Sequence, residues 1–145
     1  MKVLIVEDSQ KKLTGIIDTV SRYTDDYRVT KFVSTALIMC GDENYDLIIT
    51  DLGLPRFVDH PIVVDAKEGL KMLYDLSYQD QYIPAIIYST TQISEEEKAY
   101  TKDIKYPVLG QVTTDTELDE KIQEYLKKNK EGNVILKLEN KIGEN

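Results

Sequence analysis

The sequence predicts an α/β fold in which five parallel strands form one sheet with helices on both faces. Along the 145 residues, short apolar segments of strand length alternate with longer amphipathic segments of helical period. Strands that alternate with helices form βαβ units, which place parallel strands in one sheet with the connecting helices over its faces. The length fits a single domain with its own hydrophobic core.

The five predicted strands are short apolar runs bounded by polar or turn-forming residues. The first of them is a continuous apolar run, Val3-Leu4-Ile5-Val6, which is typical of a strand covered on both faces. Pro84 stands at the start of the fourth, where its missing N–H does least harm to the sheet. The predicted strands are 2–6, 27–33, 46–50, 83–88 and 107–112.

The predicted helices are marked by apolar residues at helical spacing and by capping residues at their starts. Asp8 and Ser9 are both suitable N-caps for the first helix. Ser94 and Thr114 are each followed three residues later by a glutamate, the spacing of a capping box, and so begin the fourth and fifth helices. The predicted helices are 9–22, 35–41, 68–76, 94–101 and 114–128.

Composition and charge narrow the classes of function. The formal net charge of −8 argues against nucleic acid as a partner, because nucleic-acid binding requires a basic surface. It is compatible with Mg²⁺ or with a basic protein surface. No apolar run approaches the ~20 residues that span a bilayer, so we expect no membrane segment. The single cysteine cannot form an internal disulfide, which makes a reducing cytoplasm the expected location.

Polar residues that can carry chemistry follow the predicted strands at their carboxyl ends. Glu7 and Asp8 follow the first strand, Asp51 the third and Ser89 the fourth. The carboxyl ends of parallel strands meet at one edge of the sheet, where ligands bind in open α/β folds. At an effective dielectric near 20, each pair of carboxylates ~5 Å apart repels by ~3 kcal/mol. Such a cluster is tolerated where a divalent cation lies between the carboxylates.

Mg²⁺ is the cation that suits this set of oxygen ligands. It takes one or two carboxylates, keeps several waters and accepts a backbone carbonyl, which Gly53 can offer two residues after Asp51. With Mg²⁺ holding phosphate oxygens, the Asp51 carboxylate can attack phosphorus and form an acyl phosphate. Ser89 can then donate a hydrogen bond to a phosphoryl oxygen.

Three segments in this order resemble the receiver domain of two-component response regulators. They are Val3-Leu4-Ile5-Val6-Glu7-Asp8-Ser9, Asp46 to Pro55, and Ile83-Pro84-Ala85-Ile86-Ile87-Tyr88-Ser89. The resemblance covers residues 1–128 apart from an insertion at about 56–66. It implies a flavodoxin-like fold with strand order 2-1-3-4-5.

The resemblance also implies a function and the residues that carry it. Glu7 and Asp8 are expected to bind Mg²⁺, Asp51 to take a phosphoryl group from a histidine kinase or phosphotransfer protein, and Ser89 to sense that group. Because no output domain follows residue 128, we expect a stand-alone signalling protein and no classical enzyme. Its signal would pass to a downstream protein through the surface of the fourth helix, fifth strand and fifth helix.

The sequence departs from the receiver pattern at the end of the fifth strand. The family has a lysine followed by proline there, and counting back from the last helix places Gln111 and Val112 at these positions. An alternative register makes Lys105 the displaced lysine. Gln111 supplies no cation, so we expect slower phosphorylation or weaker coupling to a shape change. Arg56 and Lys67, which flank the insertion, are candidates for the missing charge.

The aromatic residue that receiver domains carry on the fifth strand is also out of place. Its position falls near Val108, and the sequence leaves both Tyr88 and Tyr106 open as substitutes. The insertion itself is open to two further interpretations, as a lid and as a surface for a partner.

The sequence leaves alternatives open for the structure of the C-terminal tail and for the function of the chain. Residues 129–145 are predicted as a polar tail whose apolar island, 134–138, forms an edge strand, pairs two copies of the chain or is disordered. The main alternative function is a pseudo-receiver, an interaction module that works without phosphorylation. An aspartate-nucleophile phosphatase is a third alternative, but it needs an acid two residues after the nucleophile, where Gly53 stands.

Overall fold

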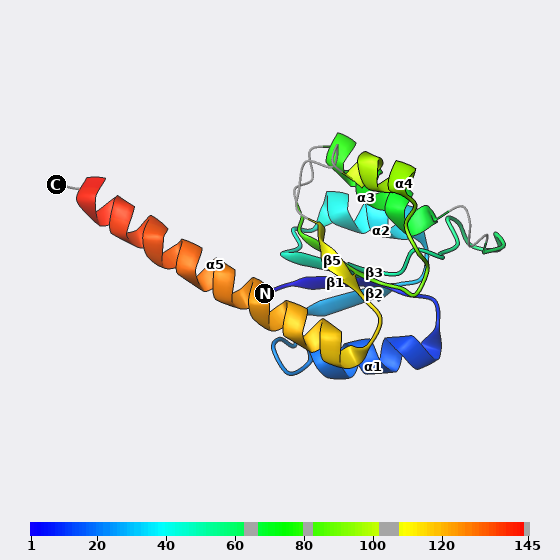
Figure 1. Ribbon diagram of the computed structural model, residues 1–145, viewed down its shortest axis with the longest axis horizontal. Coiled ribbons are helices and arrows are strands. Elements are labelled where there is room, and N and C mark those ends of the chain that lie inside the picture. Colours follow the sequence, from blue (N-terminus) through cyan, green and yellow to red (C-terminus); the bar gives the residue numbers. More distant parts are fainter. Residues whose placement is uncertain (63–66, 80–82, 102–107, 144–145) are drawn as a thin grey trace.

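The computed structural model describes residues 1–62, 67–79, 83–101 and 108–143, with the backbone alone for 100–101 and 130–143. Its five strands form one parallel sheet in the order β2-β1-β3-β4-β5 (Figure 1). The predicted flavodoxin-like class and strand order are therefore confirmed. The strands are β1 (Val3–Val6), β2 (Tyr27–Thr30), β3 (Leu47–Thr50), β4 (Ala85–Tyr88) and β5 (Val108–Val112).

Helices cover both faces of this sheet. Helices α1 and α5 lie on one face and α2, α3 and α4 on the other (Figure 1). Among the residues that the structure describes, no helix combines the length and the apolar composition needed to cross a membrane. The helices are α1 (Gln10–Val20), α2 (Val33–Asp42), α3 (Glu68–Tyr78), α4 (Glu95–Thr101) and α5 (Asp115–Gly143).

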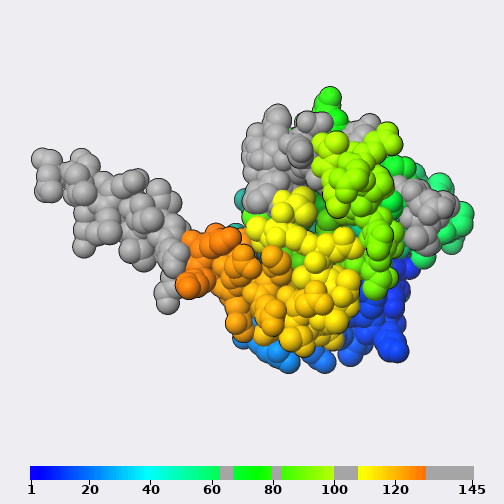
Figure 2. Space-filling view, viewed as in Figure 1, coloured from blue at the N-terminus to red at the C-terminus, as the bar shows by residue number. Residues whose placement is uncertain are grey.

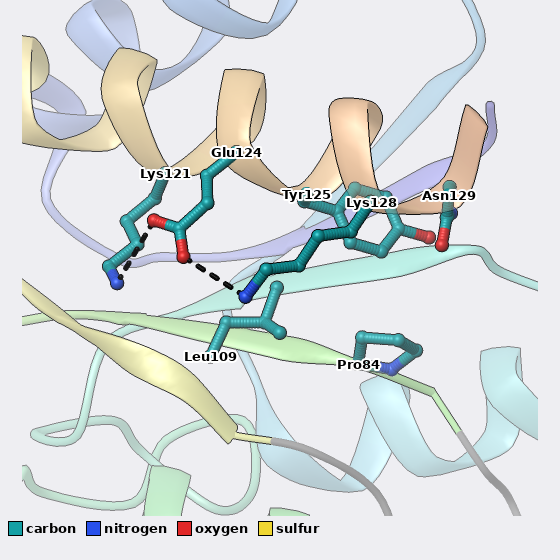
Figure 3. Close-up of a pocket in the computed structure, with 7 residues that line it drawn as sticks. All are labelled: Pro84, Leu109, Lys121, Glu124, Tyr125, Lys128 and Asn129. Atoms are coloured by element: carbon teal, nitrogen blue, oxygen red, sulfur yellow. Dashed lines mark hydrogen bonds and ion pairs between the residues drawn. The ribbon is translucent and has the colours of Figure 1, made fainter. Parts of the chain in front are cut away.

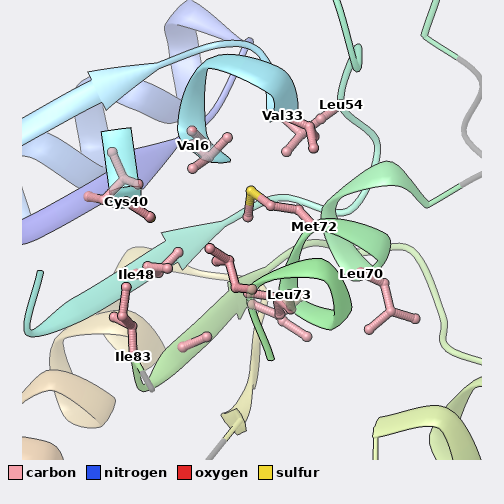
Figure 4. Close-up of a cluster of buried hydrophobic side chains, with 14 of the residues drawn as sticks. Val6, Val33, Cys40, Ile48, Leu54, Leu70, Met72, Leu73 and Ile83 are labelled. Atoms are coloured by element: carbon pink, nitrogen blue, oxygen red, sulfur yellow. The ribbon is translucent and has the colours of Figure 1, made fainter. Parts of the chain in front are cut away.

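The central strands divide the hydrophobic core into two clusters because successive side chains point to opposite faces. Leu4 and Ile48 are buried in the cluster under α2 and α3, which Figure 4 shows. Ile5 and Ile49, one residue further along each strand, are buried in the cluster under α1 and α5. Strands β1, β3 and β4 are buried at every position, as expected for strands covered on both faces.

Helix α2 begins earlier than its sequence predicts. Its first residue is Val33, and Phe32 at the N-cap makes no side-chain capping bond. The first turn is held from outside instead. The N–H groups of Val33 and Ser34 donate to the carbonyls of Pro55 and Arg56, at 3.2 and 2.9 Å. These bonds also fix the start of the loop after β3, which stands out from the body of the molecule in Figures 1 and 2.

Helix α5 is longer than predicted. It continues to Gly143, so the apolar island at 134–138 is helical and the interpretation as an edge strand is wrong. The residues around the island explain this, since lysine, glutamate and leucine favour helix and outnumber the β-branched Val134 and Ile135. The helix extends well beyond the sheet (Figure 1). The division of the chain near residue 128 stays a prediction.

Strand β5 contains a bulge that sets its final register. Ala85 pairs with Val108 but Ile86 pairs with Gly110, so one extra residue is accommodated in β5. Gly110 has a φ of 151°, a conformation that residues with a side chain rarely adopt. The bulge brings Gln111 opposite Ile87, next to the carboxyl edge of the sheet.

Candidate functional site

Three carboxylates meet at the carboxyl edge of the sheet. Glu7, Asp8 and Asp51 each place an oxygen within 4.8 Å of the others, and we refer to them as the acidic cluster. The sheet brings them together because β1 and β3 are neighbours with Val6 opposite Thr50. The Asp51 N–H also donates to the Val6 carbonyl at 3.1 Å. The predicted convergence of these three residues is therefore what the backbone produces.

Glu7 is the buried member of the acidic cluster, with only 1% of its surface exposed. Its Oε1 accepts a hydrogen bond from the Ser9 N–H at 3.0 Å. Among the described buried side-chain atoms, its Oε2 is the one without a hydrogen-bond partner. Burial raises the pKa of Glu7 above its usual 4.5, and the charge of Asp51 raises the pKa further. A buried carboxylate oxygen that accepts no hydrogen bond, beside two other carboxylates, fits a hard divalent cation such as Mg²⁺.

Asp51 is more accessible, as a phosphoryl acceptor must be. Its side chain is 15% exposed. Its Oδ1 accepts a short hydrogen bond of 2.7 Å from the Leu52 N–H, which fixes the orientation of the carboxylate at the end of β3. The other oxygen, Oδ2, faces a lysine. The carboxylate is thus oriented by backbone on one side and by charge on the other.

That lysine is Lys12, which the sequence interpretation did not single out. Its Nζ lies 3.2 Å from Glu7 Oε2 and 3.4 Å from Asp51 Oδ2, and it donates to the Tyr88 carbonyl at 3.0 Å. The contact with Glu7 is an ion pair without hydrogen-bond geometry. A signal was present in the sequence: a lysine in the first helical turn opposes the helix dipole, which favours acids there. A nearby anion offsets this unfavourable interaction.

Ser89 directly follows β4, and Gln111 lies in β5, one residue before the end of that strand. Ser89 is buried, and its Oγ accepts a hydrogen bond from the Thr91 N–H at 3.1 Å. The Gln111 amide donates to the carbonyls of Ser89 and Thr91, at 2.6 and 2.8 Å. Gln111 therefore holds the segment after β4 by hydrogen bonds, and its amide is directed to that backbone.

The two side chains that flank the insertion and were candidates for a positive charge near Asp51 form ion pairs with other residues. Arg56 binds Glu68 at 2.7 Å and Asp75 at 3.1 Å, both on α3. Lys67 pairs with Glu97 at the start of α4. Among the described ion pairs, Asp51 pairs with Lys12. Arg56 and Lys67 thus attach the long loop to α3 and α4.

Of the two tyrosines that could replace the missing aromatic residue of β5, the structure describes Tyr88. Tyr88 is buried, and its hydroxyl donates to Asp115 Oδ1 at 2.8 Å. Burial raises the pKa of Tyr88 to about 12, and the bond to Asp115 acts in the same direction. Its ring lies 5.0 Å from Lys12 Nζ, a cation–π distance. Tyr106 and Lys105 lie outside the described residues.

The ion pair between Lys67 and Glu97 gives a prediction for pH. The lysine, and next the Ser94 N–H, lower the pKa of Glu97 to about 2. A lowered carboxyl pKa stabilises the fold above pH 4.5, and that stability is lost as the pH falls from 4.5 towards 2. We expect Glu97→Gln to lower the free energy of unfolding by about 1 kcal/mol at pH 7, since solvent screens a surface pair. Urea denaturation measures this difference.

Glutamine keeps the capping box, because the Ser94 N–H bond to Glu97 Oε1 needs only an acceptor. The matched control is Glu95→Gln, whose side chain is 90% exposed. An equal loss in both variants, or a loss that persists at pH 2, would contradict the assignment.

A shallow pocket lies at the other end of the sheet, between α5 and the starts of β4 and β5 (Figure 3). Its two described lysines, Lys121 and Lys128, both pair with Glu124, at 3.5 and 3.2 Å. Pro84 and Leu109 contribute its apolar side. Because both lysines are already paired and the pocket is open, the acidic cluster is the better candidate for the functional site.

Solved receiver domains share this architecture. The receiver domain of the Francisella response regulator 1452 has a TM-score of 0.67 and 24% identity, over 88% of this chain and 98% of that one. The CheY-like receiver domain protein of Methanospirillum hungatei JF-1 has a TM-score of 0.68 and 17% identity, over 90% and 97%. The Vibrio cholerae chemotaxis protein CheY4 has a TM-score of 0.64 and 21% identity, over 85% of this chain and 96% of that one.

The fold is therefore that of the response regulator receiver domains, and the predicted resemblance is confirmed at this level. The sequence itself matches no family model and no curated protein. What the chain does with this fold must be argued from its site.

Proposed function

We propose that this chain is a receiver that accepts a phosphoryl group on Asp51, with Mg²⁺, from a histidine kinase or phosphotransfer protein. The observation that carries the proposal is the acidic cluster: three carboxylates from adjacent strand ends, one of them buried with an oxygen that accepts no hydrogen bond. Uncompensated, such a cluster costs folding free energy. A site for a divalent cation beside a nucleophilic carboxylate explains why the chain retains it.

Glu7, Asp8 and Asp51 would hold the metal ion. As a further ligand we propose the Gly53 carbonyl, two residues after Asp51 in the sequence. When bound, Mg²⁺ neutralises charge on the phosphoryl oxygens. Asp51 then uses an oxygen lone pair to form the new O–P bond. The donor's own bond to phosphorus breaks, and the donor leaves with that electron pair, so that no oxidant or further reactant is needed. The Leu52 N–H keeps the Asp51 carboxylate oriented during the attack.

Ser89 and Gln111 would convert the phosphoryl group into a change at the segment after β4. Among the described contacts the Ser89 hydroxyl acts as an acceptor, so its hydrogen can be donated to a phosphoryl oxygen. That donation would pull on the turn that Gln111 holds through the carbonyls of Ser89 and Thr91. The turn leads into α4, so the signal would leave through α4, β5 and α5 to a downstream protein. The setting we propose is the cytoplasm, where such kinases act.

A pseudo-receiver is the second candidate function. Two observations favour it: Asp51 already has a cation partner in Lys12, and the Gln111 amide binds backbone carbonyls. In this alternative the acidic cluster and Lys12 compensate one another, and partners bind without phosphorylation. Uptake of a phosphoryl group separates the two functions.

The test is intact-protein mass spectrometry after incubation with a small acyl phosphate and Mg²⁺. We expect the gain of one phosphoryl group, which is absent in Asp51→Asn. The matched control is Asp46→Asn, because Asp46 is exposed at the opposite end of β3, where it accepts from the Lys2 N–H at 2.7 Å. A wild-type chain that gains no mass would favour the pseudo-receiver. A gain that persists in Asp51→Asn would exclude Asp51 as the acceptor.

A further inference from the structure

Lys12 occupies an unusual position for a lysine. Ser9 is the N-cap of α1 and its side chain accepts from the Lys12 N–H, so Lys12 lies in the first turn. A cation there is destabilised by the helix dipole, and the first turn of α1 contains no acid to offset it. The lysine is compensated by Glu7 and Asp51 at the sheet edge. The contacts of Lys12 therefore belong to the site and not to its own helix.

The three contacts of Lys12 are unequal. An ammonium group has three donors and no acceptor. Nζ lies 3.0 Å from the Tyr88 carbonyl, 3.2 Å from Glu7 Oε2 and 3.4 Å from Asp51 Oδ2. The contact with Asp51 is the longest of the three, and 31% of the lysine side chain is exposed. Two contacts can anchor the ammonium while the third moves to an incoming anion.

The other described candidates for a cation at Asp51 are committed elsewhere. Arg56 binds Glu68 and Asp75, and Lys67 binds Glu97. Gln111, at the end of β5, is uncharged and donates to backbone carbonyls. Transfer of a phosphoryl group adds negative charge at Asp51, and a charge-assisted hydrogen bond is about twice as strong as a neutral one.

We propose that Lys12, from the first turn of α1, is the cation that binds the phosphoryl group on Asp51. The proposal rests on the function proposed above. On transfer, the donor that faces Asp51 Oδ2 moves to a phosphoryl oxygen, while the contacts with the Tyr88 carbonyl and Glu7 hold the ammonium in place. Lys12 in α1 would thus provide the positive charge that the uncharged Gln111 in β5 cannot provide.

The same position makes Lys12 a competitor of the metal ion. Its ammonium lies against two of the three carboxylates that would bind Mg²⁺. Removing the charge should therefore strengthen Mg²⁺ binding while weakening phosphoryl transfer. A lysine that only stabilised the fold would not produce these opposite effects.

The experiment compares Lys12→Gln with Lys11→Gln, a neighbouring exposed lysine. Calorimetric titration with Mg²⁺ measures metal affinity, and a mass-spectrometric time course with acetyl phosphate at saturating Mg²⁺ measures phosphoryl uptake. We expect Lys12→Gln to bind Mg²⁺ about threefold more tightly or better and to take up the phosphoryl group about tenfold more slowly or worse. Tighter metal binding also shows that the variant is folded. Lys11→Gln should match the wild type in both.

Three outcomes would overturn the proposal, each in a distinguishable way. If Lys12→Gln binds Mg²⁺ more tightly and is phosphorylated as fast as the wild type or faster, Lys12 only takes the place of the metal ion. If neither quantity changes, Lys12 has no part in the site. If the wild type and Lys11→Gln take up no phosphoryl group, the proposed function fails, and the phosphoryl contact fails with it.

Discussion

Replacing Glu7 by glutamine should make the metal-free protein more stable and remove its response to Mg²⁺. Glu7 is buried, its Oε2 lacks a hydrogen bond and Asp51 adds like charge, so the ionised carboxylate is held at a cost that the ion pair with Lys12 offsets only in part. Glutamine keeps an acceptor for the Ser9 N–H but carries no charge. We expect a gain of about 1–2 kcal/mol in the free energy of unfolding at pH 7.

The pH dependence follows from the raised pKa of Glu7. An acid whose pKa is raised in the folded state destabilises the fold above that pKa, and this penalty disappears below the ordinary value of 4.5. The advantage of Glu7→Gln should therefore fade as the pH falls from the raised pKa of Glu7 towards 4.5, and be absent below 4.5.

Urea denaturation with and without Mg²⁺ measures both effects of Glu7→Gln. The wild type should gain stability as Mg²⁺ is added, in proportion to binding, and Glu7→Gln should not. The exposed Glu95→Gln is the control and should respond to Mg²⁺ as the wild type does. A Glu7→Gln protein that is still stabilised by Mg²⁺ would show that Glu7 is no metal ligand. A metal-free Glu7→Gln protein that is less stable than the wild type would show that the ion pair with Lys12 outweighs the cost of burying the charge.

Replacing Gly69 by alanine should destabilise the protein by about 3 kcal/mol or more. A Cβ at Gly69 would lie 1.9 Å from the carbonyl oxygen of Asp51 and 3.0 Å from the Leu52 Cα. Both are backbone atoms, and the Gly69 N–H donates to the Leu52 carbonyl at 3.0 Å, so α3 cannot move away without losing that bond. The start of α3 is thus packed directly on the residue that we propose as acceptor.

Gly41→Ala is the matched control for Gly69→Ala. Gly41 also lies in a helix, and a Cβ there meets no atom within 4 Å. Alanine is the better helix former, so Gly41→Ala should raise stability by about 0.5–1 kcal/mol. Denaturant midpoints of the two variants should therefore shift in opposite directions. If Gly69→Ala is as stable as the wild type and keeps phosphoryl uptake, the close approach of α3 to Asp51 is not needed.

The strands and their parallel pairing could be predicted because they depend on patterns that the sequence displays, whereas the order of the strands came from the resemblance to receiver domains. Continuous apolar runs such as Val3 to Val6 indicate strands buried on both faces, and alternation with helices requires parallel pairing. Since parallel strands end at one edge, the convergence of Glu7, Asp8 and Asp51 followed from their positions alone.

What could not be predicted depends on contacts between distant segments. The early start of α2 depends on the carbonyls of Pro55 and Arg56, which no local pattern reveals. The contact of Lys12 with Asp51 needs a long side chain to reach across from α1 to β3. Gly69 and Asp51 are 18 positions apart in sequence but in contact in the fold. The periodicity of the sequence assigns a residue to one face of its helix or strand, but it does not say which distant residue that side chain contacts.

The central claim is that Asp51 is the residue that takes the phosphoryl group. The direct measurement is to treat the protein, after incubation with acetyl phosphate and Mg²⁺, with sodium borohydride, which reduces an acyl phosphate to the alcohol. Peptide mass spectrometry then locates the reduced residue. We expect reduction of Asp51, the residue directly after β3, in the wild type, and none without acetyl phosphate. Reduction at another acid, with Asp51 recovered unchanged, would contradict it.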